Sequence, residues 1–256
     1  AYYHRNGITL ACEPGGFLSK PLQDAINAVY SDDATPFNHC FIGDGKSFHA
    51  IKPNDATSLL AETRKVENWG EGRTWYLPDQ VKLFTDGAIY SQLMQMKDGY
   101  LGADGRPDPS HHGEWMTTPE KLEERSKAYW DAGYQLHIHV NGDAGLDTVL
   151  DVLERRMREH PRADHRTVIV HFANSTEEQI SRIARLGALV SANPYYTVGF
   201  ADKYGAHGLG AARADAMVRS GSVLKHGIPL SFHSDLPMGP SDPLYLAWCA
   251  VNRVTT

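Results

Sequence analysis

The feature that most constrains the fold is a repeated alternation between short apolar runs and longer segments with helical periodicity. Seven runs have the length and composition of strands: Ile8–Cys12, Asn38–Ile42, Gln80–Phe84, Gln135–Val140, Thr167–His171, Ala188–Ala192 and Pro229–His233. Strands that alternate with helices form parallel sheets, because each crossover returns the chain to the same end of the sheet. The pattern therefore predicts an α/β protein.

Helix boundary signals support this interpretation. Four segments have helical spacing of apolar residues or suitable boundary residues: Pro119–Ala132, Gly145–His160, Thr176–Leu186 and Ala211–His226. Thr118 can cap the first segment, and Gly187 and Gly227 follow the last two, as glycine commonly does at helix ends. We expect a further helix over Trp248–Arg253 that continues to the last residues of the chain.

The length of 256 residues is close to the roughly 250 typical of one (β/α)₈ TIM-type barrel. We therefore expect residues 1–256 to form a single, partial barrel domain. Seven strands would leave two open sheet edges, and open edges invite aggregation. The sequence predicts that the first strand of the barrel precedes residue 1 in the complete protein.

One long segment, Ser91–Thr118, has no clear periodicity and contains Gly, Pro and a His-His pair. It follows a predicted strand, where barrel enzymes place the loops that contact substrate. Long loops in compact domains are either functional or disordered. We expect a lid or specificity loop here.

Composition narrows the partners and the compartment. The net charge is -6 without a Lys/Arg block, which disfavours a nucleic-acid partner. The apolar runs are too short to span a bilayer. Three widely spaced cysteines form neither a disulfide framework nor a CxxC zinc site, so we expect unmodified buried thiols in a cytoplasmic protein. The sequence leaves the oligomeric state open.

Four polar residues stand at or near the carboxyl ends of predicted strands: Lys82, His139, His171 and Asp235. In a parallel barrel these ends meet at one mouth, so residues far apart in sequence can form one site. Neutral imidazole is a ligand suited to divalent transition metals. A metal centre at the mouth of the barrel is therefore one interpretation of these residues.

Each of these residues also has a simpler interpretation. A buried lysine can pair with an acid such as Asp86, a strand histidine is often only hydrogen-bonded in the core, and Asp235 could cap a turn. Strand alternation would direct Val81 and Leu83 to one face and Lys82 to the other. If the first two contact helices, Lys82 points into the barrel.

The order of these residues resembles the metal-dependent amidohydrolases, and most closely the branch called amidohydrolase family 3, which includes N-substituted formamide deformylases. The similar stretches are Val81–Gly87 to the family's "K-x-F-x-D-G", His139–Asp143 to "H-x-x-G-D", Ile169–His171 to "x-x-H", and Phe232–Pro237, Asp242–Leu244 and Ala250–Arg253 to "S-D-x-P … D-P-L … A-V-x-R". The motifs occur in the family's order between about residues 8 and 253.

The resemblance implies a (β/α)₈ metallohydrolase with one or two divalent ions, expected to be zinc. By position, Lys82 would be a bridging lysine, often carboxylated in such enzymes. His139 and His171 would be metal ligands, and Asp235 a ligand and the general base. Residues that would support the site or contact substrate are Asp86, His137, Asn141 and His233.

The implied reaction is hydrolysis of a small amide-type C–N bond by metal-activated water. Deamination or lactone opening on the same site are alternatives, because a fold does not determine the chemistry. The family's first strand carries an H-x-H pair for the second metal, and this chain has no such strand. The small β-sandwich domain of the family is also absent from it. A non-catalytic barrel fragment is therefore a further alternative.

Overall fold

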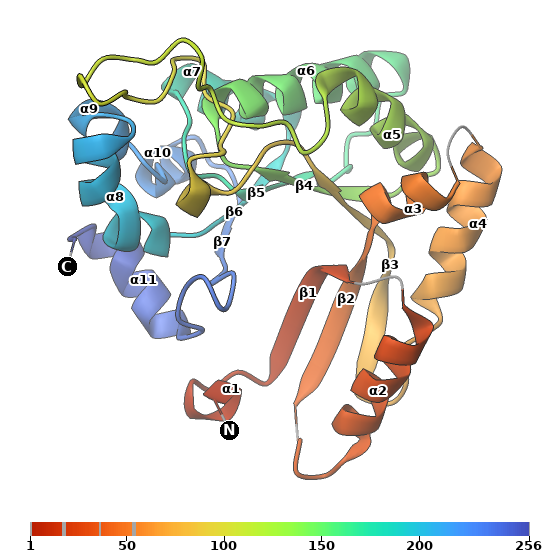
Figure 1. Ribbon diagram of the computed structural model, residues 1–256. Coiled ribbons are helices and arrows are strands. Elements are labelled where there is room, and N and C mark those ends of the chain that lie inside the picture. Colours follow the sequence, from red (N-terminus) through yellow and green to blue (C-terminus); the bar gives the residue numbers. More distant parts are fainter. Residues whose placement is uncertain (1, 17–18, 36, 53–54, 256) are drawn as a thin grey trace. The chain divides into compact units, whose positions relative to one another are not determined.

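A parallel β-sheet with helices along the chain between its strands organises the fold (Figure 1). The computed structural model describes residues 2–16, 19–35, 37–52 and 55–255. Within these residues the sheet has seven strands in chain order, from β1 to β7. The strands are β1 (Leu10–Gly16), β2 (Asn38–Asp44), β3 (Thr74–Phe84), β4 (Gln135–Val140), β5 (Val168–His171), β6 (Leu189–Ala192) and β7 (Leu230–Phe232). The predicted α/β class is confirmed.

The helices are α1 (Tyr2–Arg5), α2 (Lys20–Ser31), α3 (Gly45–Ile51), α4 (Ala56–Glu67), the short 3₁₀ helix η1 (Ile89–Ser91), α5 (Pro119–Asp131), α6 (Asp143–Glu159), α7 (Glu177–Leu186), α8 (Tyr195–His207), α9 (Ala211–Asp215), α10 (Ser220–Lys225) and α11 (Pro243–Asn252). Among the described residues, no helix is both long and apolar enough to cross a membrane.

The chain divides into two compact units. Unit 1 contains the residues up to Leu83 together with Glu123–His137, and unit 2 contains Phe84–Leu122 and the residues from Ile138 onward. The expectation of a single barrel domain over the whole chain stays a prediction.

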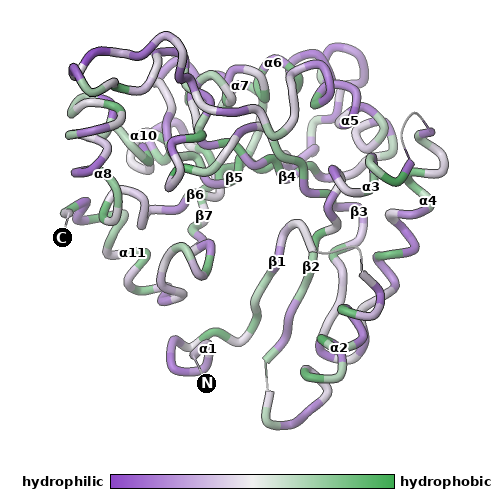
Figure 2. Tube along the Cα trace, viewed as in Figure 1, coloured by the Kyte–Doolittle hydropathy of each residue, from purple (hydrophilic) through white to green (hydrophobic). Residues whose placement is uncertain are grey.

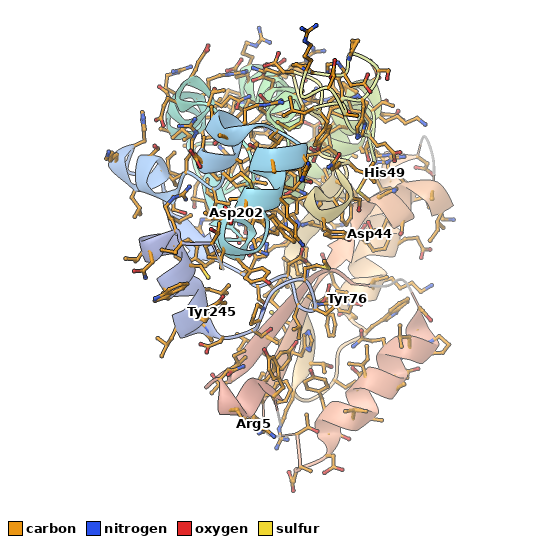
Figure 3. The ribbon with its side chains drawn as sticks, turned by 60° about the vertical axis from the view of Figure 1, so that its left-hand side comes forward. Arg5, Asp44, His49, Tyr76, Asp202 and Tyr245 are labelled. Atoms are coloured by element: carbon orange, nitrogen blue, oxygen red, sulfur yellow. The ribbon has the colours of Figure 1, made fainter. Side chains whose placement is uncertain are left out.

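Unit 1 contains β1, β2 and β3 with the helices that cover one face of them. The strands pair in parallel, with Cys12 opposite Cys40 and Asp44 opposite Lys82. Asp44 ends β2 and also begins α3, because its carboxylate accepts the backbone N–H of Lys46 at 2.9 Å. Figure 3 labels Asp44 and also His49, which belongs to α3.

Unit 2 contains the carboxyl half of β4 with β5, β6 and β7. β5 pairs with β6 and β6 with β7, both in parallel. Ile138, Val140, Ile169 and Val190 are at most 1% exposed, and Figure 2 shows hydrophobic residues along β4 and β5. Strands buried on both faces are expected where helices cover a parallel sheet.

The predicted single helix Ala211–His226 is wrong, because the chain forms two helices, α9 and α10, with a break between them. Val218 adopts a left-handed backbone conformation with φ of 48°, and its N–H donates to the carbonyl of Ala173. The guanidinium of Arg253 donates to three carbonyls around the break, those of Asp215, Met217 and Val218. These partners stabilise the interruption.

The prediction that the last helix continues through Arg253 is also wrong. α11 ends at Asn252, and Arg253 follows it with a left-handed φ of 52°. Its side chain can then turn back toward the carbonyls beside α9. The same arginine therefore ends one helix and holds the break between two others.

His165 holds the end of α7, where the chain turns into β6, beside the start of β5. Its Nδ1 accepts the backbone N–H of Thr167 at 3.0 Å, and its Nε2 lies 2.8 Å from the carbonyl of Leu186, the last residue of α7. Nε2 must carry the hydrogen, because a carbonyl can only accept and Nδ1 already accepts. The fold thus requires a neutral imidazole, and burial lowers the pKa of His165 below its ordinary 6.5.

The requirement for a neutral His165 imidazole predicts that this residue's contribution to stability depends on pH. A group whose folded pKa is depressed contributes fully above its unfolded pKa, and the contribution is lost as pH falls below about 6.5. Relative to His165→Gln, the wild-type protein should lose stability toward acid by at most about 1.4 kcal/mol per pH unit, the limit for one proton. Urea unfolding of both proteins at pH 7.5, 6 and 5 measures this. A stability difference that is the same at all three values would contradict the neutral-imidazole requirement.

Candidate metal centre

His139 occupies the carboxyl end of β4 and is nearly buried. Its Nε2 lies 3.2 Å from the side-chain nitrogen of Asn141 and 3.9 Å from a carboxylate oxygen of Asp86. Its backbone carbonyl accepts the N–H of Thr85 at 3.0 Å, which aligns the end of β4 with the segment after β3. The imidazole is thus oriented by both side-chain and backbone contacts.

His171 ends β5 in an unusual backbone conformation. His171 and Phe172 both have left-handed φ angles, 79° and 54°, which are uncommon for residues other than glycine. Hydrogen bonds on both sides hold this turn: the N–H of Phe172 donates to Val140, and the carbonyl of His171 accepts from Asn193. The turn brings the His171 ring to 4.4 Å from that of His139, centroid to centroid.

His233 extends this pair into a row of three imidazoles. It follows β7, and its Nε2 lies 3.0 Å from Nδ1 of His171. Its Nδ1 lies 3.1 Å from the hydroxyl of Ser191 on β6. Side chains from β4, β5, β6 and β7 therefore meet at the carboxyl ends of the strands in unit 2.

Asp235 and Tyr196 complete the group. A carboxylate oxygen of Asp235 lies 3.8 Å from Nδ1 of His171 and accepts a hydrogen bond of 3.4 Å from the Tyr196 hydroxyl. The same hydroxyl lies 3.2 Å from Nδ1 of His171. Burial, and then the charge of Asp235, raise the pKa of Tyr196 well above 10, so the phenol keeps its proton and can donate it in a hydrogen bond.

The strand-end pattern did not select Tyr196 for the site. Its contacts with His171 and Asp235 depend on α8 beginning at Tyr195, directly after β6. The position directly after the Asn193-Pro194 strand end was a usable signal, because strand ends carry the functional residues in parallel sheets. Ser191 gave no signal of its own.

Asp86 lies beneath this group and is completely buried. Its two oxygens accept backbone N–H groups from Gln95 at 2.9 Å, Asn141 at 2.9 Å and Gly142 at 2.7 Å. Burial raises the pKa of Asp86 to about 7, while the three N–H donors act in the opposite direction. The carboxyl group ties the loop after β3 to the end of β4, which carries His139.

The loop Ser91–Thr118 is hydrogen-bonded to the segment that follows β4 and to α9. The carbonyl of Gln95 accepts N–H groups from Ala144 and Gly145 in the first turn of α6. Further along the loop, the carbonyls of Asp98 and Gly99 accept from Arg213 of α9. The proposed role in substrate selection stays a prediction.

Lys82 and His137 belong to unit 1, whereas the three histidines and Asp235 described above belong to unit 2. A Cβ added to Gly45 of α3 would lie within 2.8 Å of side-chain atoms of Val81 and Leu83, so these two residues face α3. Lys82 therefore points to the opposite face, as alternation predicted, and it is 2% exposed. Its role as a bridging ligand stays a prediction.

His137 lies on the same strand as His139 and contacts Gln80 of β3. Its Nε2 is 2.9 Å from the side-chain oxygen of Gln80. Burial, and then the positive charge of Lys82, lower the pKa of His137 to about 4. The imidazole of His137 is therefore uncharged at neutral pH.

The donor types in unit 2 fit a divalent transition metal, since they are imidazoles and a carboxylate at strand ends. The buried side-chain oxygen of Asn141, beside His139, has no hydrogen-bond partner among the described residues and could serve a cation or a substrate group. In the part of the chain that the structure describes, however, no three His, Cys, Asp or Glu side chains are grouped so as to hold an ion. The chemistry fits a metal, and the arrangement is not a complete ligand set.

Parallel α/β barrels place their functional residues at the carboxyl ends of the strands, where the histidines and Asp235 of unit 2 lie. Residues 2–256 match the Amidohydrolase family, and the chain belongs to this family.

Three relatives are similar in sequence. The protein LONG AFTER FAR-RED 3 of Arabidopsis thaliana is 28% identical over 70% of this chain and 30% of its own length. The putative amidohydrolase YtcJ of Bacillus subtilis is 26% identical over 76% of this chain and 36% of its own length. The N-substituted formamide deformylase of Arthrobacter pascens is 27% identical over 68% of this chain and 31% of its own length. The chain thus spans about a third of the length of these curated relatives.

Two solved structures share the fold. Both are uncharacterised metal-dependent hydrolases, one from Pyrococcus horikoshii and one from Pyrococcus furiosus. Their TM-scores are 0.67 and 0.70, with 22% and 20% identity. The match with the Pyrococcus horikoshii protein covers 90% of this chain and 42% of that protein. The match with the Pyrococcus furiosus protein covers 95% of this chain and 46% of that protein. At this identity the likeness concerns the fold.

The role of Asp86 predicts a large cost of its removal. Asp86→Ala would leave three buried N–H groups without an acceptor, at about 1 kcal/mol or more each, so unfolding free energy should fall by about 3 kcal/mol or more. Asp86→Asn keeps one acceptor oxygen and should cost less. Asp104→Ala is the matched control, because exposed Asp104 accepts a single N–H, from Arg106. Equal losses for Asp86→Ala and Asp104→Ala in urea unfolding would contradict this account.

Proposed function

We propose that this chain provides the catalytic strand ends of a metal-dependent hydrolase that cleaves small amide-type C–N bonds. The observation behind this proposal is that His171 contacts both His139 and His233, at the ends of β5, β4 and β7. Asp235 lies beside His171. Family membership and the name of one relative, an N-substituted formamide deformylase, support the choice of an amide bond. The substrate is a small molecule, and the enzyme is expected in the cytoplasm.

His139 and His171 would hold the metal, with Asp235 as a further ligand, and zinc suits imidazole and carboxylate donors. Lys82 stays a candidate ligand by family resemblance, and its carboxylation would turn a buried cation into an anion with two donor oxygens. When bound, a divalent metal ion would supply Lewis-acid activation of water and of the substrate carbonyl.

The remaining chemistry falls to the protein's own side chains. Asp235 would take the proton of the attacking water on a carboxylate oxygen and deliver it to the leaving nitrogen. Tyr196 donates to that carboxylate and contacts His171, so it holds the general base and the ligand in a fixed relation. Asn141, through its unpaired oxygen, could accept an N–H of the substrate.

Asp235→Asn tests the general base. The amide cannot accept the proton, so kcat should fall by about 10² to 10⁴, the usual contribution of a general base. The assay uses the complete natural protein and measures the release of amine and formate from N-substituted formamides. Lactones and aminopyrimidines serve as alternative substrates. Exposed Asp202, labelled in Figure 3, gives the matched control Asp202→Asn. Wild-type turnover in Asp235→Asn would refute the role, and faster lactone or aminopyrimidine turnover would identify another reaction class.

A second prediction concerns metal content, because no three-ligand group is present in the described residues. After loading with zinc and gel filtration, this chain alone should retain at most one ion, and His171→Gln should retain less. Elemental analysis of both proteins measures this. Two tightly held ions per chain would contradict it and would require ligands beyond the proposed set.

A further inference from the structure

Cys12 and Cys40 stand directly opposite each other on neighbouring strands of unit 1. β1 and β2 pair in parallel with Cys12 in register with Cys40. Residues paired in this way have their side chains on the same face of the sheet, about 4.8 Å apart between strands. A disulfide needs Cα atoms about 4.4–6.8 Å apart, so the backbone already has a suitable spacing.

The two thiols interact with each other. Both are free cysteines, Cys12 exposed and Cys40 buried. A hydrogen bond between the thiols lowers the pKa of Cys40 and raises that of Cys12. The S–H group of Cys12 thus stabilises the thiolate of Cys40, and the proton of Cys12 becomes harder to remove.

Their surroundings add a positive charge and a route for a reagent. The pKa of Cys12 is raised, first by the hydrogen bond with Cys40 and then by burial, whereas the ammonium of Lys82 acts in the opposite direction. Exposed Cys12 can be reached from solvent, whereas Cys40 is 4% exposed. These two residues are 28 positions apart in the sequence, and only the strand register brings them together.

We propose that Cys12 and Cys40 form a cross-strand dithiol that peroxide oxidises to a disulfide, which makes them a redox modification site on the sheet face that carries Lys82. The sulfur of one cysteine attacks the peroxide O–O bond and becomes a sulfenic acid, as one water leaves. The sulfur of the other cysteine then attacks this sulfenic sulfur, and the hydroxyl leaves as a second water. Two thiols lose two electrons and two protons, and one peroxide is reduced to two waters.

Differential alkylation of the intact chain tests the proposal. The protein is treated with hydrogen peroxide, denatured, alkylated with N-ethylmaleimide and mapped by mass spectrometry without reductant. The wild-type chain should lose two of its three alkylation sites, show a Cys12–Cys40 linked peptide, and regain both sites after dithiothreitol. Buried Cys249 in unit 2 is the internal control and should remain alkylated.

Variants separate a pair from two independent thiols. Cys249→Ser should behave as wild type, whereas Cys12→Ser should leave Cys40 alkylated. Because the exposed Cys12 is the altered residue, a folding defect is not expected to account for the result. Phenylarsine oxide, which needs two adjacent thiols, should form a one-to-one adduct with wild type and Cys249→Ser and none with Cys12→Ser. Disulfide-linked dimers through Cys12, oxidation of Cys249 at the rate of Cys12, or retention of all three thiols would each overturn the proposal.

Discussion

The rest of the site in unit 2 depends on the hydrogen bonds that the buried carboxyl group of Asp86 accepts. Two segments 46 residues or more apart in sequence present backbone N–H groups where regular strand pairing has ended. Buried N–H groups need an acceptor, and Asp86 supplies three such bonds from one side chain. A hydrocarbon side chain of the same size could fill the space and could not accept these hydrogens.

This arrangement determines where His139 stands. Asp86 accepts from Asn141, two residues after His139, and the side-chain amide of Asn141 in turn contacts the His139 ring and the carbonyl of Gly87. Gly142 also lacks space for a side chain, because a Cβ there would lie 2.1 Å from the carbonyl oxygen of Gln95. The requirement for Asp, Asn and Gly at these positions is therefore geometric as well as chemical.

Local patterns were sufficient to predict the sheet, and insufficient where distant residues decide the conformation. Gln135–Val140 was predicted to the residue, because a buried strand between Gly133 and the following Asn-Gly turn is defined by its own sequence. The predicted helix Ala211–His226 was wrong, because its break depends on Ala173 and Arg253, which lie 35 residues or more from Val218. The lone signals of His139, His171 and Asp235 gained meaning from the strand order, which places them at one end of the sheet.

Contacts between side chains of different strands could not be derived from the sequence. Nothing in the sequence distinguishes Tyr196 from the adjacent Tyr195, and only the start of α8 directs the Tyr196 hydroxyl to His171 and Asp235. The Cys12 and Cys40 pair is a similar case, because a register shift of one residue would place the thiols on opposite faces.

The row of imidazoles also constrains which nitrogen can serve a metal. Nδ1 of His171 has both the Tyr196 hydroxyl and Nε2 of His233 within 3.2 Å. A histidine ligand usually uses one ring nitrogen for the metal and the other for a hydrogen bond that fixes its tautomer. With Nδ1 engaged in this way, His171 would bind through Nε2. Its neighbours Tyr196 and His233 would then act by holding the ring, and Ser191, which contacts His233, would extend this support to β6.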